Sequence, residues 1–99
     1  MTIVDVIQAP SALTRSVLLW LRCSHDIDLT DLPKGSVDDG YGCPVALALQ
    51  KKYGPEAWVD HAVFSTGDGE TSLPGFVSEW VELFDDGRYP DYREGEVNG

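Results

Sequence analysis

Residues 74–86 constrain the fold more than any other segment, because their apolar side chains recur with the period of an α-helix. The apolar positions fall at i, i+4, i+7 and i+8, with two valines beside them: Phe76, Trp80, Leu83, Phe84, Val77 and Val81. Pro74 favours the start of a helix and Gly87 its end. A helix with so wide an apolar stripe needs other elements to cover it. A chain of 99 residues builds one core, so we expect a single domain, residues 1–99.

Two further segments are predicted to be helices. Residues 11–23 begin with Ser11, a residue type that caps helix N-termini, and their apolar residues line one face: Leu13, Val17, Trp20 and Leu21. Residues 44–53 begin with Pro44, which is favoured at the first helical position, and follow Cys43 at the cap position. A Gly-Pro pair then predicts the end of this helix, whose inner face is Val45, Ala48 and Leu49.

The remaining apolar segments predict strands. Residues 57–65 are rich in Trp, Val and Phe, and a turn containing two glycines separates them from residues 70–73, so we expect a hairpin. If residues 57–65 form one strand, one face carries Trp58, Asp60, Ala62 and Phe64, and the other carries Val59, His61 and Val63. Residues 88–97 are expected to add an edge strand before a frayed tail, residues 94–99. Residues 2–8 fit a short strand or an extra turn of helix, with the strand favoured.

Together these elements predict an α+β fold in which three helices pack on a small antiparallel sheet. The strand order stays open. The expected core is Leu13, Val17, Trp20, Leu21, Val45, Leu49, Val63, Phe76, Trp80, Leu83 and Phe84.

Residues 24–42 are predicted to form a long loop pinned to the core by a few apolar side chains. The segment has four glycine or proline residues and five aspartates. Loops of this length are uncommon in compact domains and often have a function, so this loop is a candidate site region. The alternative is an irregular connection between the first two helices.

The charge of the chain limits its partners. Seventeen acidic residues stand against seven basic ones, and residues 56–99 hold eleven acids and two bases, or nine of the ten net negative charges. Such a charge repels nucleic acid and anionic lipid and attracts basic protein surfaces. The predicted binding residues are Glu79, Glu82, Asp85, Asp86, Asp91 and Glu94. The alternative is that these acids only keep the protein in solution.

Four short runs in the chain carry a resemblance: LTDLPKG at 29–35, CPVALAL at 43–49, LPGFV at 73–77 and FDDG at 84–87. As a set they resemble a group of small acidic proteins of actinobacteria and their phages, for which no function is established. The resemblance covers most of residues 29–87. It implies a phage context and supplies no catalytic residues.

Cys43 and His61 are the candidates for catalysis. A thiol at a helix N-terminus gains thiolate character from the helix dipole, and His61 could act as its base, oriented by Asp60, Asp38 or Asp39. No oxyanion donor is evident, so the alternative is that Cys43 only caps the helix.

No cofactor and no metal site are predicted. Cys23, His25, Cys43 and His61 lack the local pairing of a zinc site, and we expect Cys23 in the core and His25 exposed. The aspartates of residues 24–42 do not follow the calcium-loop pattern.

These observations favour a non-enzymatic acidic binding protein that engages a basic surface of a host protein or mimics the charge of a nucleic acid. The alternatives are a small thiol enzyme using Cys43 and His61, and an accessory component of a phage assembly. The first residues contain neither a basic leader nor a long apolar stretch, so we expect a cytoplasmic protein that makes no direct contact with membranes. Its two cysteines are expected to remain thiols.

Overall fold

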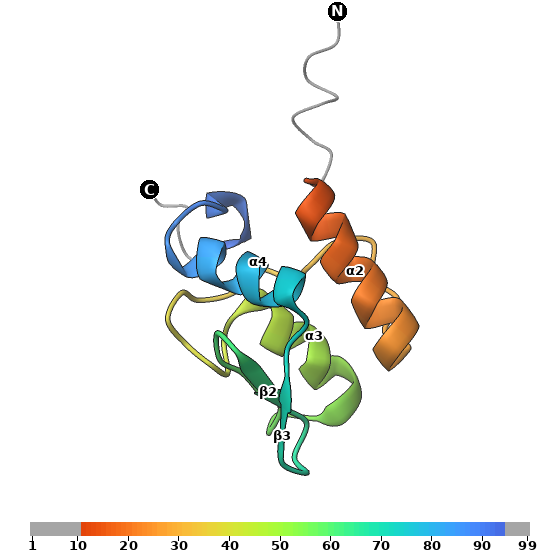
Figure 1. Ribbon diagram of the computed structural model, residues 1–99. Helices are drawn as coiled ribbons and strands as arrows, with labels where there is room; N and C mark the ends of the chain where they lie inside the picture. The colour runs from red at the N-terminus through yellow and green to blue at the C-terminus, as the bar shows by residue number, and fades with distance from the viewer. Residues whose placement is uncertain (1–10, 95–99) are drawn as a thin grey trace, which may run out of the picture.

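The computed structural model describes residues 11–94 and shows an α+β fold, as the sequence predicted (Figure 1). The three helices α2, α3 and α4 pack together beside a three-stranded antiparallel sheet, whose strand order is β1-β2-β3. The elements in chain order are α2 (Ala12–His25), α3 (Pro44–Tyr53), β1 (Trp58–Val59), β2 (Val63–Ser65), β3 (Glu70–Ser72), α4 (Gly75–Asp85) and the 3₁₀ helix η1 (Pro90–Tyr92). The segment predicted at residues 2–8 lies outside the described residues.

The helix ends follow the capping signals in the sequence. The Ser11 hydroxyl accepts a hydrogen bond from the backbone N–H of Thr14 at 3.1 Å and caps α2. This helix continues to His25, two residues beyond its predicted end, and Asp26 closes it in a left-handed conformation (φ 57°). The bounds of α3 are those predicted. No helix in residues 11–94 is long and apolar enough to cross a membrane.

The prediction that residues 57–65 form one strand is wrong, because a tight turn divides them. The backbone N–H of Asp60 donates to the carbonyl of Val63 at 2.8 Å, and the chain reverses between β1 and β2. The predicted alternation of side chains between the two faces of a single strand therefore ends at Val59. His61 lies in the turn and is exposed, whereas the sequence placed it within a strand.

The core forms where the three helices meet. The fully buried side chains of the predicted core are Val17, Leu21, Val45, Leu49, Trp80 and Phe84. Trp80 stacks on Phe84 and on Tyr89, and its indole N–H donates to the Thr14 hydroxyl at 2.8 Å, which links α4 to α2.

Phe76 was predicted in the core but is 37% exposed. The buried face of α4 is centred one residue further round the helix, at Val77, Trp80, Val81 and Phe84, with spacing i, i+3, i+4 and i+7. Four further residues of the predicted core are half-buried: Leu13, Trp20, Val63 and Leu83.

Backbone hydrogen bonds fix the long loop that leads into α3. Gly35 donates to the carbonyl of Tyr92 at 2.7 Å, and its own carbonyl accepts from Glu94 at 2.8 Å. A Cβ atom at Gly35 would lie 2.1 Å from the carbonyl oxygen of Gly42, so only glycine fits there. Instead of the edge strand predicted for residues 88–97, the described part of this segment forms η1 and a single parallel bridge between Gly35 and Arg93.

Candidate functional site

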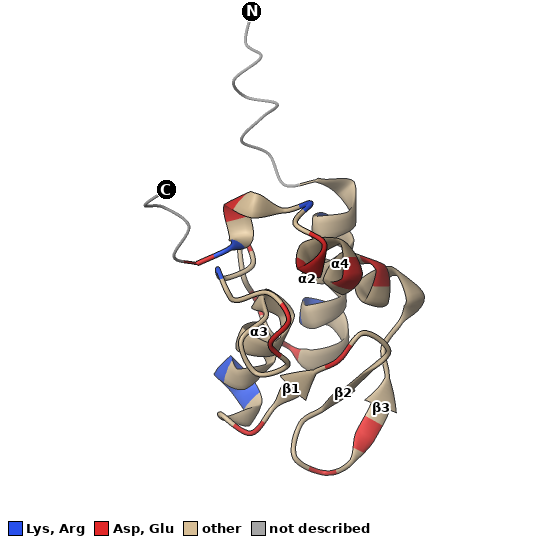
Figure 2. Cartoon of the chain, turned by 90° about the vertical axis from the view of Figure 1, so that its left-hand side faces the viewer, with Lys and Arg blue, Asp and Glu red and all other residues tan. Residues whose placement is uncertain are grey.

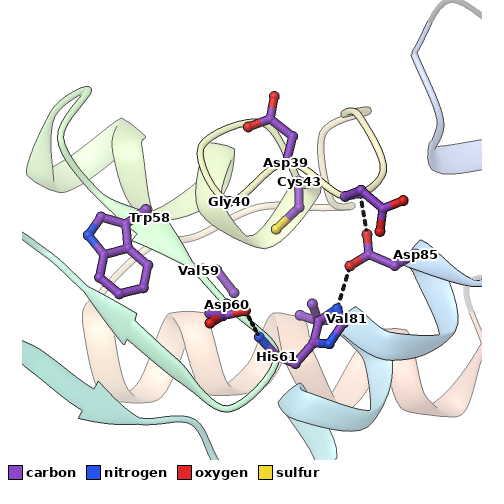
Figure 3. A pocket seen from close by; sticks show the side chains of 10 residues that line it. Asp39, Gly40, Cys43, Trp58, Val59, Asp60, His61, Val81 and Asp85 are labelled. Carbon is purple, nitrogen blue, oxygen red and sulfur yellow. Dashed lines mark hydrogen bonds and ion pairs between the residues drawn. The ribbon is translucent and has the colours of Figure 1, made fainter.

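A cavity of about 340 Å³ lies between the loop before α3, the strand β1 with its following turn, and the C-terminal end of α4 (Figure 3). Residues from all three segments line it: Asp38, Asp39, Gly40, Cys43, Trp58, Val59, Asp60, His61, Val81 and Asp85. Four of the ten are aspartates, and three are the apolar side chains Trp58, Val59 and Val81. The cavity thus combines apolar surface with a high density of carboxylates.

Asp85 joins the three segments that form this cavity. One carboxylate oxygen lies 2.7 Å from Nε2 of His61, and the other accepts the backbone N–H of Asp38 at 2.9 Å. The side chain of Asp85 is only 12% exposed. Asp85 therefore has a structural contact on each carboxylate oxygen, beyond the binding role predicted for it from the sequence.

His61 is held in the turn after β1 by its main chain. Its backbone N–H donates to the Asp60 carboxylate at 2.8 Å, and its carbonyl accepts the Ser78 hydroxyl of α4. The hydrogen bond with Asp85 raises the pKa of His61, burial opposes this by lowering it, and the charges of Asp85, Asp60 and Glu82 raise it further. His61 therefore gains a proton at a higher pH than an isolated histidine.

Cys43 is buried at the N-terminus of α3, where its sulfur accepts the backbone N–H of Ala46 at 3.4 Å. Burial raises the pKa of this thiol to about 11, although the N–H groups of Ala46 and Val45 lower it, and the charges of Asp85 and Asp39 add to the increase. The thiolate character expected from the helix N-terminus is thus outweighed by burial.

The predicted partners Cys43 and His61 line the same cavity, but no hydrogen bond joins them in residues 11–94. In Figure 3 the sulfur points into the space between the loop and β1, and the His61 ring lies beyond Val81. The acid that contacts the His61 ring is Asp85, and not Asp60, Asp38 or Asp39 as the sequence suggested.

A second, more open groove of about 470 Å³ adjoins the cavity at His61. It is lined by His61, Glu79, Glu82, Leu83 and Asp86. We call the carboxylates of the two concavities the acidic face; its members are Asp38, Asp39, Asp60, Glu79, Glu82, Asp85 and Asp86.

The acidic face lies on one side of the molecule. Figure 2 shows Asp and Glu positions on α4, on the loop before α3 and between β1 and β2 in one view, together with further acidic positions on β3 and η1. No lysine or arginine lines either concavity in the described chain. Arg88 contacts Asp86 at 3.3 Å, but both side chains are more than two-thirds exposed, so solvent screens this ion pair.

The structure brings together four of the six predicted binding residues, Glu79, Glu82, Asp85 and Asp86. Asp91 lies in η1 and Glu94 follows it, and neither lines the two concavities. Sequence reasoning did not include Asp38, Asp39 and Asp60 among the binding residues. The sequence did contain a signal for Asp38 and Asp39, because both belong to residues 24–42, the long loop that was predicted as a candidate site region.

The expected positions of Cys23 and His25 are reversed. Cys23 is exposed, whereas His25 is half-buried, with its ring against Trp20, Tyr53 and Phe64 and its Nδ1 2.9 Å from the Tyr53 hydroxyl. Burial and the charge of Lys52 lower the pKa of His25. Within residues 11–94 no three His, Cys, Asp or Glu side chains are placed to hold a metal ion.

Comparison of the chain with protein-family models, with curated proteins and with solved structures gave no match in any of the three.

Proposed function

We propose that this protein is a non-enzymatic binding protein whose acidic face engages a basic surface on a partner protein. The observation that supports the proposal is the gathering of seven carboxylates around two adjoining concavities that no lysine or arginine lines in the described chain. Charges of one sign around a concave, partly apolar surface concentrate the electric field there and increase the rate of encounter with oppositely charged partners.

Three separate segments contribute these carboxylates, and the contacts of Asp85 hold the segments together. A rigid arrangement lowers the entropy lost on binding, so it favours a specific partner over diffuse attraction. Carboxylates that only keep a protein in solution would not have to gather from three segments around the same two concavities.

The proposal includes a cellular context. The resemblance to small proteins of actinobacteria and their phages supports a phage origin, with the host cytoplasm as location and a basic host protein as partner. A role as an accessory component of a phage assembly fits the same acidic face if the basic partner is a phage protein.

The alternative of a thiol enzyme has one observation in its favour, since Cys43, His61 and Asp85 line one cavity. A thiol whose pKa is raised to about 11 and that has no hydrogen bond to His61 is a poor nucleophile at neutral pH. Alkylation rates separate the two possibilities. We expect exposed Cys23 to react with iodoacetamide at an ordinary rate and Cys43 to react only on unfolding; reaction of Cys43 in the folded protein below neutral pH would favour the enzyme.

Binding of decalysine tests the proposed function. Isothermal titration at about 50 and about 300 mM salt measures the affinity of the wild-type protein and of two variants of equal charge. Glu79→Gln with Glu82→Gln removes two charges from the acidic face, and Asp68→Asn with Glu70→Gln removes two exposed charges near the turn between β2 and β3, away from both concavities.

We expect the higher salt concentration to weaken decalysine binding at least about tenfold. Each exposed ion pair contributes up to about 1 kcal/mol of binding free energy. Glu79→Gln with Glu82→Gln should therefore lose about five- to tenfold in affinity for decalysine at low salt, whereas Asp68→Asn with Glu70→Gln should lose less than about twofold. Equal losses in the two variants would mean that decalysine responds to net charge alone, and the proposal would be wrong.

A further inference from the structure

The cavity beside Cys43 differs from the open groove on α4 in having apolar walls beneath its carboxylates. Val59 and Val81 are almost fully buried and form its base, and the half-buried Trp58 forms one wall. In Figure 3 the Trp58 ring stands at one end of the cavity, while His61 and Asp85 stand at the other. A ligand that lies along this space would contact apolar surface over most of its length and carboxylates at the end away from Trp58.

The thiol of Cys43 extends the apolar lining of this cavity. Cys43 is 2% exposed, and its sulfur points into the cavity (Figure 3). The sulfur accepts the backbone N–H of Ala46 at 3.4 Å. A buried free cysteine packs as a small apolar residue with a weak S–H donor, so it offers the cavity apolar surface and no charge.

We propose that this cavity binds the side chain of a single arginine or lysine of the partner protein. Arginine and lysine place an aliphatic stem along apolar surface and keep the charged head in a polar environment, which is the order of surfaces found here. The stem would lie along the cavity from the Trp58 end, over Val59 and Val81, and the head would lie near the exposed rim carboxylates of Asp38 and Asp60. The inference rests on the proposed function and names the anchor of that binding.

The composition of the cavity separates this ligand from other candidates. An anion is repelled by the aspartates, and a metal ion finds no group of three suitable ligands in residues 11–94. A neutral apolar side chain would leave the carboxylates of Asp38 and Asp60 without a counter-charge. The cavity volume of about 340 Å³ lies at the lower end of the range for ligand sites, which suits one side chain better than a larger molecule.

The test compares two short peptides by NMR titration of the ¹⁵N-labelled protein. Both are acetylated and amidated and contain glycine and alanine around a central residue, which is arginine in one and citrulline in the other. Citrulline keeps the shape and most hydrogen-bonding groups of arginine but has no charge. Asp38→Asn with Asp60→Asn removes two charges from the rim of the cavity. Asparagine tolerates the left-handed backbone at position 38 (φ 53°), and the asparagine at position 60 can still accept the His61 backbone N–H. The hairpin pair Asp68→Asn with Glu70→Gln is the control of equal charge.

We expect the arginine peptide to shift the amides around residues 38–43, 58–61 and 81–85 and the indole N–H of Trp58. The citrulline peptide should bind at least about tenfold more weakly, and the rim variant should lose about tenfold while the control loses less than about twofold. Equal binding of the two peptides, shifts centred on the hairpin, or equal losses in the two variants would each overturn the anchor site. If decalysine binding still depends on Glu79 and Glu82 in that case, the proposed function stands and only the cavity is excluded.

Discussion

Replacing Asp85 by alanine should destabilise the fold and loosen the candidate site at the same time. Asp85 contacts the turn after β1 through His61 and the loop before α3 through the backbone N–H of Asp38. Alanine removes both contacts and leaves α4 intact, because the Asp85 side chain does not cap the helix. The neighbouring Asp86→Ala is a matched control, since the Asp86 side chain is exposed and, among the described residues, its contact is the screened one with Arg88.

The size of the effect follows from the two contacts. The bond from the Asp38 N–H to a mostly buried carboxylate contributes about 1.5 kcal/mol. His61 is 51% exposed, so solvent screening limits its contact with Asp85 to about 0.5–1 kcal/mol. We expect Asp85→Ala to lower the free energy of unfolding by about 2 kcal/mol, equivalent to about 8–16 °C in Tm for a domain of this size. Asp86→Ala should change it by less than about 0.5 kcal/mol.

The loss should depend on pH in a defined direction. The pKa of His61 is raised in the folded protein above its ordinary value of 6.5. Stabilisation from the His61–Asp85 contact is therefore complete below pH 6.5 and is lost as the pH rises through the folded pKa. The difference between the wild-type protein and Asp85→Ala should accordingly be larger near pH 6 than near pH 9.

Urea denaturation at several pH values measures these free energies, and NMR titration of the His61 ring measures its pKa. Asp85→Ala should return the pKa of His61 toward the ordinary value. A change in unfolding free energy below about 0.5 kcal/mol, or a His61 pKa that does not move, would refute the role given to Asp85.

Two further substitutions test the fold around the site. Thr14→Val removes the hydroxyl that accepts the buried Trp80 indole N–H, so it should lower the free energy of unfolding, measured by urea denaturation, by about 1–3 kcal/mol. A decrease below about 0.5 kcal/mol would show that this hydrogen bond is unimportant for stability. Gly35→Ala places a Cβ atom 2.1 Å from a carbonyl oxygen and should lower the free energy of unfolding by at least about 2 kcal/mol. Its control is Gly75→Ala, whose Cβ atom meets no atom within 4 Å and which should be neutral or stabilising. Equal effects of the two substitutions would contradict the packing described around Gly35.

The helices were predictable because their signals are local. Pro44 and the Gly-Pro pair after Tyr53 mark the ends of α3, and the apolar spacing in residues 74–86 identifies α4. The error at Phe76 concerns which of two overlapping apolar stripes faces the core. Trp80 and Phe84 belong to both stripes, so the sequence alone does not separate them.

The turn between β1 and β2 was missed because apolar residues continue on both sides of it. The Asp60 side chain accepts the N–H of His61, a local bond that favours a turn over an extended strand. An aspartate inside a run with strand propensity was the available signal, but the alternation of the flanking residues concealed it.

The candidate site was only partly predictable, because its contacts join distant parts of the chain. The two contacts of Asp85 reach residues 24 and 47 positions away. The excess of acids indicated the chemistry, while their convergence depends on how α4 packs against the loop and the turn. The burial of Cys43 likewise follows from packing, and it reversed the thiol pKa shift expected from the helix N-terminus.

Zero-length cross-linking to decalysine tests the central claim most directly. A carbodiimide joins lysine amines to the carboxylates that they contact, and mass spectrometry then identifies those carboxylates. The account predicts cross-links concentrated at Glu79, Glu82 and Asp60 and suppressed by high salt, with Asp68 and Glu70 mostly unmodified. Cross-links spread evenly over the exposed acids, including the hairpin, would contradict the claim that one face of this protein receives its cationic partner.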